Sequence, residues 1–287
     1  MKKYLMLIAA LLVSTSAFAD GRSAARRFFA NLERNHLKLG NASASNTFVA
    51  PTLVKGMYAI SDQNGKFVTF INEAGTLYGA GSGFDGTFPS QPGFRPLTVH
   101  ERDALRREIA DSIDKSKLIT ARYGDGQKEK FFVFSAIDCP YCKRLEDRMR
   151  DAKAVSMTHY YIPSSLRGNK TQEGRQQWQK VAAIWCAADP ERAWHAYWSG
   201  TAVPPPAGTC PFADPEMAES AQAYLWYMLK SAGVTLTGTP AYLQMDGRNF
   251  RDVPGTSINL EPAQSAYWLV GAPVELPMDF RPQPVGR

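Results

Sequence analysis

The sequence predicts a mixed α/β fold, because an apolar strand is followed closely by a paired-cysteine motif and then by a helix. Phe131–Phe134 is a run of aromatic and β-branched residues, typical of a buried strand in an α/β sheet. The motif CPYC occupies residues 139–142 after a short connection. Leu145 and Met149 then share one face of the predicted helix. This order of elements places the two cysteines where a strand ends and a helix begins.

Cys139 and Cys142, at this junction, indicate a redox dithiol on a thioredoxin-like fold. Cys139 falls at the helix N-terminus, where unpaired N–H groups and the positive end of the helix dipole favour a thiolate. Pro140 suits the first helical position because its missing N–H has no helical partner to lose. Cys142 lies one turn further and is expected to be shielded. We therefore predict Cys139 as the nucleophile and Cys142 as the resolving thiol.

The charges next to the dithiol oppose one another. Lys143 and Arg144 favour a thiolate, whereas Asp138 disfavours it, so the sequence does not give the sign of the sum. Tyr141 adds no cation to the motif, so a very low thiol pKa is not indicated. The alternatives for the cysteine pair are zinc binding and a structural disulfide.

The N-terminus has the three parts of a secretory signal, predicted at residues 1–19. Lys2 and Lys3 precede an apolar core, Tyr4–Val13, and the sequence Ala-Phe-Ala ends at Ala19. The core is shorter than the ~20 residues that span a membrane, although a retained anchor is the alternative. The remaining length suggests about two domains. The net charge of +6 is mild and without a dense basic cluster, so nucleic acid is not an indicated partner.

Secretion changes the interpretation of the remaining cysteines, Cys186 and Cys210. Four cysteines in an oxidising compartment suggest two pairs, so these two would form a structural bridge; two free thiols are the alternative. They are not a close pair and have no histidine at ligand spacing, whereas zinc needs about four ligands. We therefore expect no metal site.

Residues 20–96 are predicted to form a small N-terminal domain that begins with a helix, Gly21–Leu37. Asn64-Gly65 separates Met57–Ile60 from Phe67–Ile71, a strong hairpin signal for an antiparallel sheet. The segment holds few large apolar residues and is too small for a robust core of its own. A sheet edge offered to a second copy would solve this, which predicts a dimerisation domain. The alternative is a β unit packed on its own catalytic domain.

Residues 97–118 are predicted to form a linker helix. Thr98 and Glu101 make a capping-box signature. Leu105, Ile109 and Ile113 then form a narrow apolar stripe on an otherwise charged helix, as expected of a solvated bridge between domains. A peripheral helix of the catalytic domain is the alternative.

Residues 119–287 are predicted to form the catalytic domain. Ile119–Tyr123 and Lys130–Phe134 flank a Gly-Asp-Gly turn and are predicted to pair with each other. The elements expected after the dithiol helix are a strand at Thr158–Pro163, helices at Thr171–Ala188, Asp189–Gly200 and Asp214–Gly233, a strand at Tyr242–Met245 with a hairpin partner at Phe250–Val253, and a closing helix at Asn259–Leu269.

Thr239-Pro240 stands at the head of the strand that follows the long helical stretch. A cis-Pro240 facing Cys139 would hold the Thr239 backbone open to pair with an extended substrate segment, as in strand addition. Pro140, Tyr141, Thr239 and Pro240 are therefore the predicted substrate-binding residues. The Cys139 sulfur is expected to be ionised and reachable beside this proline.

With these parts in order, the chain resembles the DsbC/DsbG family of periplasmic protein disulfide isomerases over nearly its whole length. The most specific segment is AIWCAADPERAWHAYWSG, Ala183–Gly200, which continues to Cys210 and is similar to the DsbC segment with a second disulfide. The CPYC motif itself is the DsbG variant. The second cysteine pair favours DsbC.

The resemblance implies several properties that spacing and composition do not. It implies a V-shaped homodimer through cystatin-like N-terminal domains, with an uncharged apolar cleft and some chaperone activity. It maps Cys139 and Cys142 onto the catalytic pair, Thr239-Pro240 onto a cis-proline dipeptide, and Cys186–Cys210 onto a structural bridge. It also implies a periplasmic location and a membrane thiol reductase of the DsbD type as the partner that keeps the dithiol reduced.

The predicted function is that of a thiol-disulfide isomerase or reductase acting on misfolded or cysteine-oxidised secreted proteins. A dithiol oxidase is one alternative, because CxxC proteins span about 150 mV in potential and the motif alone does not choose. A sulfenic-acid reductase of the DsbG type and a holdase with an incidental dithiol are the others. Nothing in the sequence marks an organic cofactor.

Overall fold

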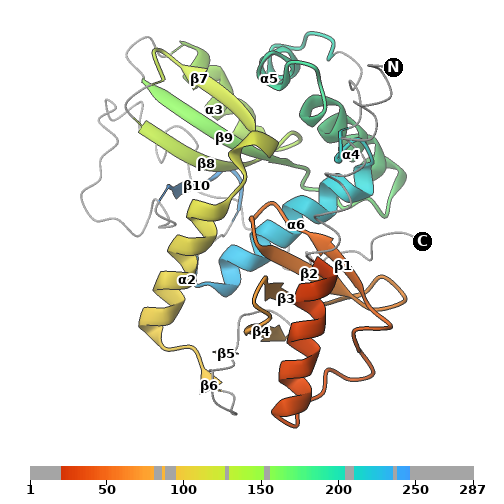
Figure 1. Ribbon diagram of the computed structural model, residues 1–287. Coiled ribbons are helices and arrows are strands. Elements are labelled where there is room, and N and C mark those ends of the chain that lie inside the picture. The colour runs from red at the N-terminus through yellow and green to blue at the C-terminus, as the bar shows by residue number, and fades with distance from the viewer. Residues whose placement is uncertain are drawn as a thin grey trace, which may run out of the picture.

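The computed structural model describes residues 21–80, 86–87, 95–126, 129–151, 156–203, 210–234 and 238–245. The predicted signal at 1–19, the hairpin partner at Phe250–Val253 and the closing helix at Asn259–Leu269 lie outside the described residues. Figure 1 shows one sheet in the upper part of the molecule, a second sheet in the lower part, and helix α6 (Pro215–Ser231) between them.

The lower sheet is an antiparallel meander in which neighbours in sequence are neighbours in space. Its strands are β1 (Phe48–Pro51), β2 (Met57–Ser61), β3 (Phe67–Asn72), β4 (Leu77–Ala80), β5 (Gly86–Thr87) and β6 (Arg95–Pro96). The β2–β3 hairpin lies where the Asn-Gly signal placed it. Gly65 adopts a φ of +75° in that turn, a conformation that a side chain disfavours.

Strand β2 is buried along its whole length, because both faces of the sheet are covered. Tyr58 and Ile60 point into a small core with Phe28 and Leu32 of the helix at residues 21–34. The alternate residues of β2 belong to the main core of the protein instead. The side-chain period of two along a strand explains this division.

The second face of the lower sheet packs on the same chain. The rings of Phe67 and Phe70 lie 5.7 and 5.8 Å from the ring of Tyr224 on α6. This is the packing expected under the alternative of a β unit held on its own catalytic domain. Strand β1 forms one edge of the sheet, and its outer side has no partner strand among the described residues.

The first helix ends at residue 34, three residues earlier than predicted. The N–H of His36 bonds to the carbonyl of Glu33 (3.0 Å) and that of Leu37 to the carbonyl of Leu32 (2.9 Å). This pair of bonds is a Schellman motif, with His36 at a φ of +57° in the place usually taken by glycine. His36 is exposed in this motif.

Helix α2 (Val99–Ser112) begins with a complete capping box between Thr98 and Glu101. Its buried residues include Leu105 and Ile109, as the narrow stripe predicted. The helix end is tied to the lower sheet, because the carbonyl of Ser112 accepts from the N–H of Lys55 at 2.9 Å. A short 3₁₀ turn, η1 (Lys115–Lys117), then leads to the upper sheet.

The upper sheet has the order β10-β8-β9-β7. Its strands are β7 (Ile119–Tyr123), β8 (Glu129–Ala136), β9 (Met157–Ser164) and β10 (Ala241–Gln244). The predicted pairing of the first two strands is wrong, because β7 pairs antiparallel with β9 and β9 pairs parallel with β8. The crossover through the dithiol helix brings β9 beside β8, and this connection displaces the hairpin that the short turn suggested.

Helix α3 (Pro140–Asp151) carries the dithiol, and α4 (Gln172–Trp185) and α5 (Pro190–Trp198) follow β9. Each later helix begins at a side-chain cap: Thr171 for α4, Asp189 for α5 and Asp214 for α6. Proline occupies the first turn of α5 and α6, where no helical N–H is lost. Among the described helices, none is long and apolar enough to cross a membrane.

Candidate active site

The dithiol lies at the end of the upper sheet, where the central strand β8 leads into helix α3. Residues 131–136 of β8 are buried, and the strand lies between β9 and β10. The N–H of Cys139 bonds to the carbonyl of Ala136 at 3.1 Å, which closes the turn between strand and helix. Pro140 is the first residue of α3, so the backbone of Cys139 stands at the helix N-terminus, as predicted.

Strand β10 brings a distant part of the chain to the dithiol. Ala241 pairs with Phe134 in the antiparallel β10–β8 ladder, so the residues just before β10 lie beside Cys139. The Thr239–Pro240 peptide bond is cis. The thiol of Cys139 donates to the carbonyl oxygen of Thr239 at 3.3 Å, across 100 positions of sequence. The structure therefore brings together the CPYC motif and the Thr239-Pro240 dipeptide, as predicted from the sequence.

The two cysteines differ in acidity because of their surroundings. The pKa of Cys139 is lowered from 9.0 to about 6, chiefly because the Cys142 thiol donates a hydrogen bond to its sulfur. The backbone N–H of Cys142 acts in the same direction, and burial opposes both. Burial raises the pKa of Cys142 well above 9.0, and the neighbouring Cys139 sulfur adds to the rise. This asymmetry assigns the thiolate to Cys139.

The sulfur of Cys139 is less open than expected. The residue is only 2% exposed, with its thiol against the Thr239 carbonyl. Pro140 is exposed and Tyr141 half-buried beside it. Any group that reaches the Cys139 sulfur from this side must displace its contact with the Thr239 carbonyl.

The cations that follow the motif are engaged elsewhere on α3. Lys143 forms an ion pair with Asp147 at 2.8 Å. The guanidinium of Arg144 lies 4.3 Å from the ring centre of Tyr141. Arg144 thus covers the aromatic member of the predicted substrate-binding set.

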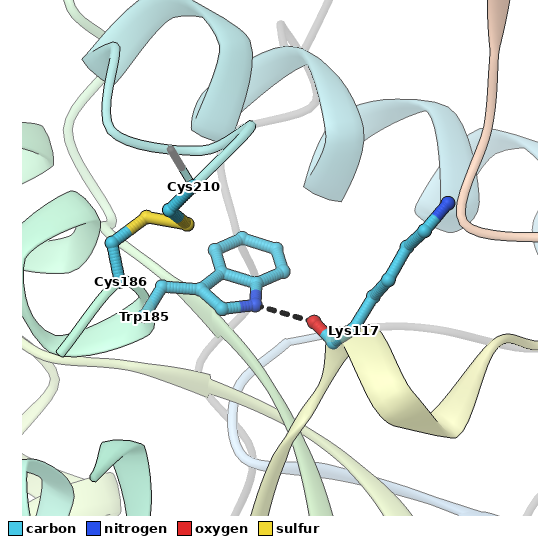
Figure 2. The surroundings of a disulfide bond; sticks show 4 residues. All are labelled: Lys117, Trp185, Cys186 and Cys210. Atoms are coloured by element: carbon cyan, nitrogen blue, oxygen red, sulfur yellow. Dashed lines mark hydrogen bonds between the residues drawn. A yellow bond between two sulfur atoms is a disulfide. The ribbon is translucent and has the colours of Figure 1, made fainter. Parts of the chain in front are cut away.

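Cys186 and Cys210 are joined in a disulfide with Cα atoms 5.5 Å apart. The bond links the end of α4 to the segment before α6. Figure 2 shows Trp185 beside it, with its indole N–H donating to the carbonyl of Lys117 at 2.6 Å. Phe212 stacks on the same indole at 4.3 Å. The disulfide therefore lies next to an indole that is bonded to the end of the 3₁₀ turn leading into the upper sheet.

A buried polar cluster that we did not predict from the sequence lies under the dithiol helix. Glu146 on α3 accepts a hydrogen bond from Tyr123 at 2.7 Å and another from Tyr161. The Tyr161 hydroxyl also lies 2.9 Å from Nδ1 of His159. Burial raises the pKa of Glu146 to about 7, although the hydrogen bonds from Tyr161 and Tyr123 oppose the rise.

A signal for this cluster exists in the sequence. Cys142, Leu145, Glu146 and Met149 stand at i, i+3, i+4 and i+7, so the glutamate lies within the apolar arc of the helix. A carboxyl group in such an arc must find hydrogen-bond donors in the core. Among the described residues, no group of three or more histidine, cysteine or acidic side chains is arranged to hold a metal ion.

A dithiol at the start of a helix, facing a cis-proline at the head of the neighbouring strand, defines a thioredoxin-like oxidoreductase. The family model of the thioredoxin-like domain matches residues 115–260, about half of the chain. The thiol:disulfide interchange protein DsbC of Dickeya dadantii is 28% identical over 210 residues, 73% of this chain and 77% of that protein. DsbC of Escherichia coli K12 is 26% identical over 205 residues, 71% and 76% of the two chains.

A solved structure, the disulfide interchange protein from Neisseria gonorrhoeae, is 25% identical with a TM-score of 0.35. It covers 47% of this chain and 85% of that one. The chain belongs to the thioredoxin-like domain family, and the curated relatives to which it is similar are DsbC thiol:disulfide interchange proteins.

The acidity of Cys139 predicts selective alkylation. With the dithiol reduced and the Cys186–Cys210 bond intact, iodoacetamide is expected to modify Cys139 with a midpoint near pH 6. Cys142 is expected to stay unmodified, since its pKa is raised well above 9.0 and it lies fully buried behind Cys139. Peptide mass mapping across a pH series measures both. A midpoint near pH 9, or preferential labelling of Cys142, would contradict the assignment.

Proposed function

We propose that the protein is a thiol-disulfide isomerase in which Cys139 is the nucleophile and Cys142 the resolving thiol. The observation that carries the proposal is the position of the Cys139 sulfur, 3.3 Å from the carbonyl of Thr239 in the cis-Thr239–Pro240 segment. Its lowered pKa keeps much of it as thiolate at neutral pH. The DsbC-like relatives support the same activity.

The reaction is a pair of thiol–disulfide exchanges. The Cys139 thiolate attacks one sulfur of a wrong disulfide, forms a mixed disulfide and releases the other substrate sulfur as a thiolate. That thiolate can attack a different substrate disulfide, and a returning substrate thiolate then frees Cys139 with no net redox change. Alternatively Cys142 loses its proton and attacks Cys139, which leaves the Cys139–Cys142 disulfide and a substrate reduced by two electrons.

The substrate-binding edge follows from the same geometry. Pro240 stands at the head of β10, and we assign it, with Thr239, Pro140 and Tyr141, to contact with an extended substrate segment. Misfolded or cysteine-oxidised secreted proteins are the proposed substrates. Because the reductive branch oxidises the dithiol, a reductant must restore it, and a membrane thiol reductase of the DsbD type is the proposed partner. Residues 1–19 are proposed as a signal that directs the chain to the periplasm.

A refolding assay without added oxidant tests the function. Catalytic amounts of the reduced protein are added to a fully oxidised, scrambled substrate with several disulfides. Native activity is expected to return, because reshuffling needs no net oxidant, whereas an oxidase would be inactive here. The variant Cys139→Ala/Cys142→Ala is expected to give the uncatalysed rate, with its fold checked by circular dichroism. Equal refolding with this variant would overturn the proposal and favour a holdase.

We further propose that the three predicted units, 20–96, 97–118 and 119–287, assemble as a homodimer through the first. Phe48 on the edge strand β1 is 63% exposed, and pairing of two such edges would bury it. Sedimentation is expected to show a dimer at micromolar concentration and a monomer for Phe48→Glu. Val99→Glu, at a site 78% exposed on α2, is the matched control and is expected to remain dimeric. A monomeric wild-type protein would contradict the dimer.

A further inference from the structure

The carboxylate next to the nucleophile is almost completely enclosed. The side chain of Asp138, which precedes Cys139, is only 8% exposed. Its oxygens accept from the Ser165 hydroxyl at 2.9 Å, from the Leu166 N–H at 2.7 Å and from the Arg167 guanidinium at 3.3 Å. All three donors belong to consecutive residues after β9. One short turn therefore supplies all three hydrogen bonds to the Asp138 carboxylate. From the sequence alone, Asp138 could be described only as a negative charge that opposes the thiolate.

Arg167 is itself held in place. Its carbonyl accepts from the indole N–H of Trp178 on α4 at 2.8 Å, and its own N–H bonds to the Ser165 hydroxyl at 3.0 Å. Its side chain bridges two carboxylates, because Nε lies 3.2 Å from Glu173 while Nη1 contacts Asp138. The guanidinium is thus directed toward the active site by its backbone and by a second acidic partner.

We propose that Arg167 is a positioning residue for the dithiol, which neutralises Asp138 and holds the turn 165–167 against the segment that carries Cys139. A buried carboxylate next to a thiol opposes ionisation of the thiol, and a cation bonded to that carboxylate cancels much of this effect. This inference rests on the proposed role of Cys139 as the nucleophile. Arg167 and the turn 165–167 thereby allow a thiolate at Cys139 to exist beside the acidic Asp138.

The other groups around this segment do not supply the same compensation. Tyr197 of α5 donates to the carbonyl of Ile137 at 3.0 Å. Burial raises the pKa of that phenol, and the nearby Asp138 charge adds to the rise. On α3, Lys143 is paired with Asp147 and Arg144 covers Tyr141. Thr239, across the site, offers a carbonyl to Cys139. Among the described residues, Arg167 is the cation bonded to Asp138.

The test is the pH profile of Cys139 alkylation in the reduced protein at low ionic strength, since Arg167 is 46% exposed and its charge is partly screened by salt. Arg167→Ala is expected to raise the midpoint by roughly one pH unit. The double variant Arg167→Ala/Asp138→Asn is expected to have its alkylation midpoint at the wild-type value or below. Arg167→Lys, which keeps the charge, is expected to give a smaller shift than alanine.

Arg175→Ala is the matched control. Arg175 also ties this loop, through the carbonyls of Asn169 and Lys170, but none of its hydrogen bonds goes to Asp138. An unchanged midpoint in Arg167→Ala, an equal shift in Arg175→Ala, or no reversal by Asp138→Asn would overturn the inference. If Arg167→Ala fails to fold, the single variant Asp138→Asn tests the inference instead. Its alkylation midpoint is expected to lie below the wild-type value, and an unchanged midpoint would contradict the inference. The readout is independent of isomerase activity, so the proposed function can fail separately.

Discussion

Replacing Cys142 with alanine is expected to trap substrate proteins on Cys139 as mixed disulfides. Cys142 sits directly behind the nucleophile, with its thiol hydrogen-bonded to the Cys139 sulfur. An attacking group held this way acts at a very high effective concentration, so its loss should lengthen the life of the adduct by at least about a hundredfold. Non-reducing gels of the Cys142→Ala protein mixed with a scrambled substrate should show a covalent complex that dithiothreitol dissolves.

Cys139→Ala is the matched control for the trap. It keeps a cysteine in the motif, yet Cys142 is fully buried and its pKa is raised, so it is not expected to capture substrate. A complex of equal yield in both variants would show that the reactive sulfur is misassigned. The trap variant also separates the two branches of the reaction, because reshuffling through a substrate thiol can continue while reduction through Cys142 stops.

The local parts of the site were predictable because each depends on neighbours in sequence. The strand, the dithiol and the helix follow one another, so the position of Cys139 at a helix N-terminus needed no tertiary information. The capping box at Thr98 is local in the same sense. The prediction that β7 pairs with β8 was wrong because it too used only local sequence. A short glycine turn suggests a hairpin, but the crossover through α3 places β9 between the two strands.

The electrostatics of the site depended on residues far apart in the chain. The sign of Asp138's influence could not be given, because its compensating donors follow β9 and reach it only in the fold. The predicted proximity of Thr239 to Cys139 did not reveal how closely the Thr239 carbonyl covers the sulfur, so the exposure of Cys139 was overestimated. Hydrophobic periodicity identified the buried face of α3, yet it gave no weight to the one acidic residue on it, Glu146.

Glu146→Gln is expected to change how stability depends on pH. In the unfolded chain this carboxyl titrates near its ordinary pKa of 4.5, whereas in the fold burial raises the pKa to about 7. Between these values the folded protein binds more protons than the unfolded chain. The free energy of unfolding therefore falls as pH rises through this window, by about 3 kcal/mol in all. Glutamine carries no charge, so the free energy of unfolding of the variant should not show this fall. Near pH 8 the variant should therefore be more stable, relative to wild type, than it is at pH 5.

The measurement is urea unfolding of the oxidised protein at pH 5 and pH 8. Oxidation removes the titration of Cys139, whose lowered pKa would otherwise stabilise the reduced fold above about pH 6. His159, with its pKa lowered to about 3 by burial, has the opposite sign and acts between about 3 and 6.5, so comparing the variant with wild type at each pH cancels it.

Glu129→Gln, at an exposed position at the start of β8, is the matched control and should follow the wild-type curve. A glutamine at 146 still fills the same volume and accepts one tyrosine bond, so at pH 5 the two proteins should differ little. If Glu146→Gln showed the same pH dependence as wild type, the carboxyl would have to be ionised in the core throughout. The two tyrosines would then be binding a buried anion directly beneath the helix that carries the dithiol.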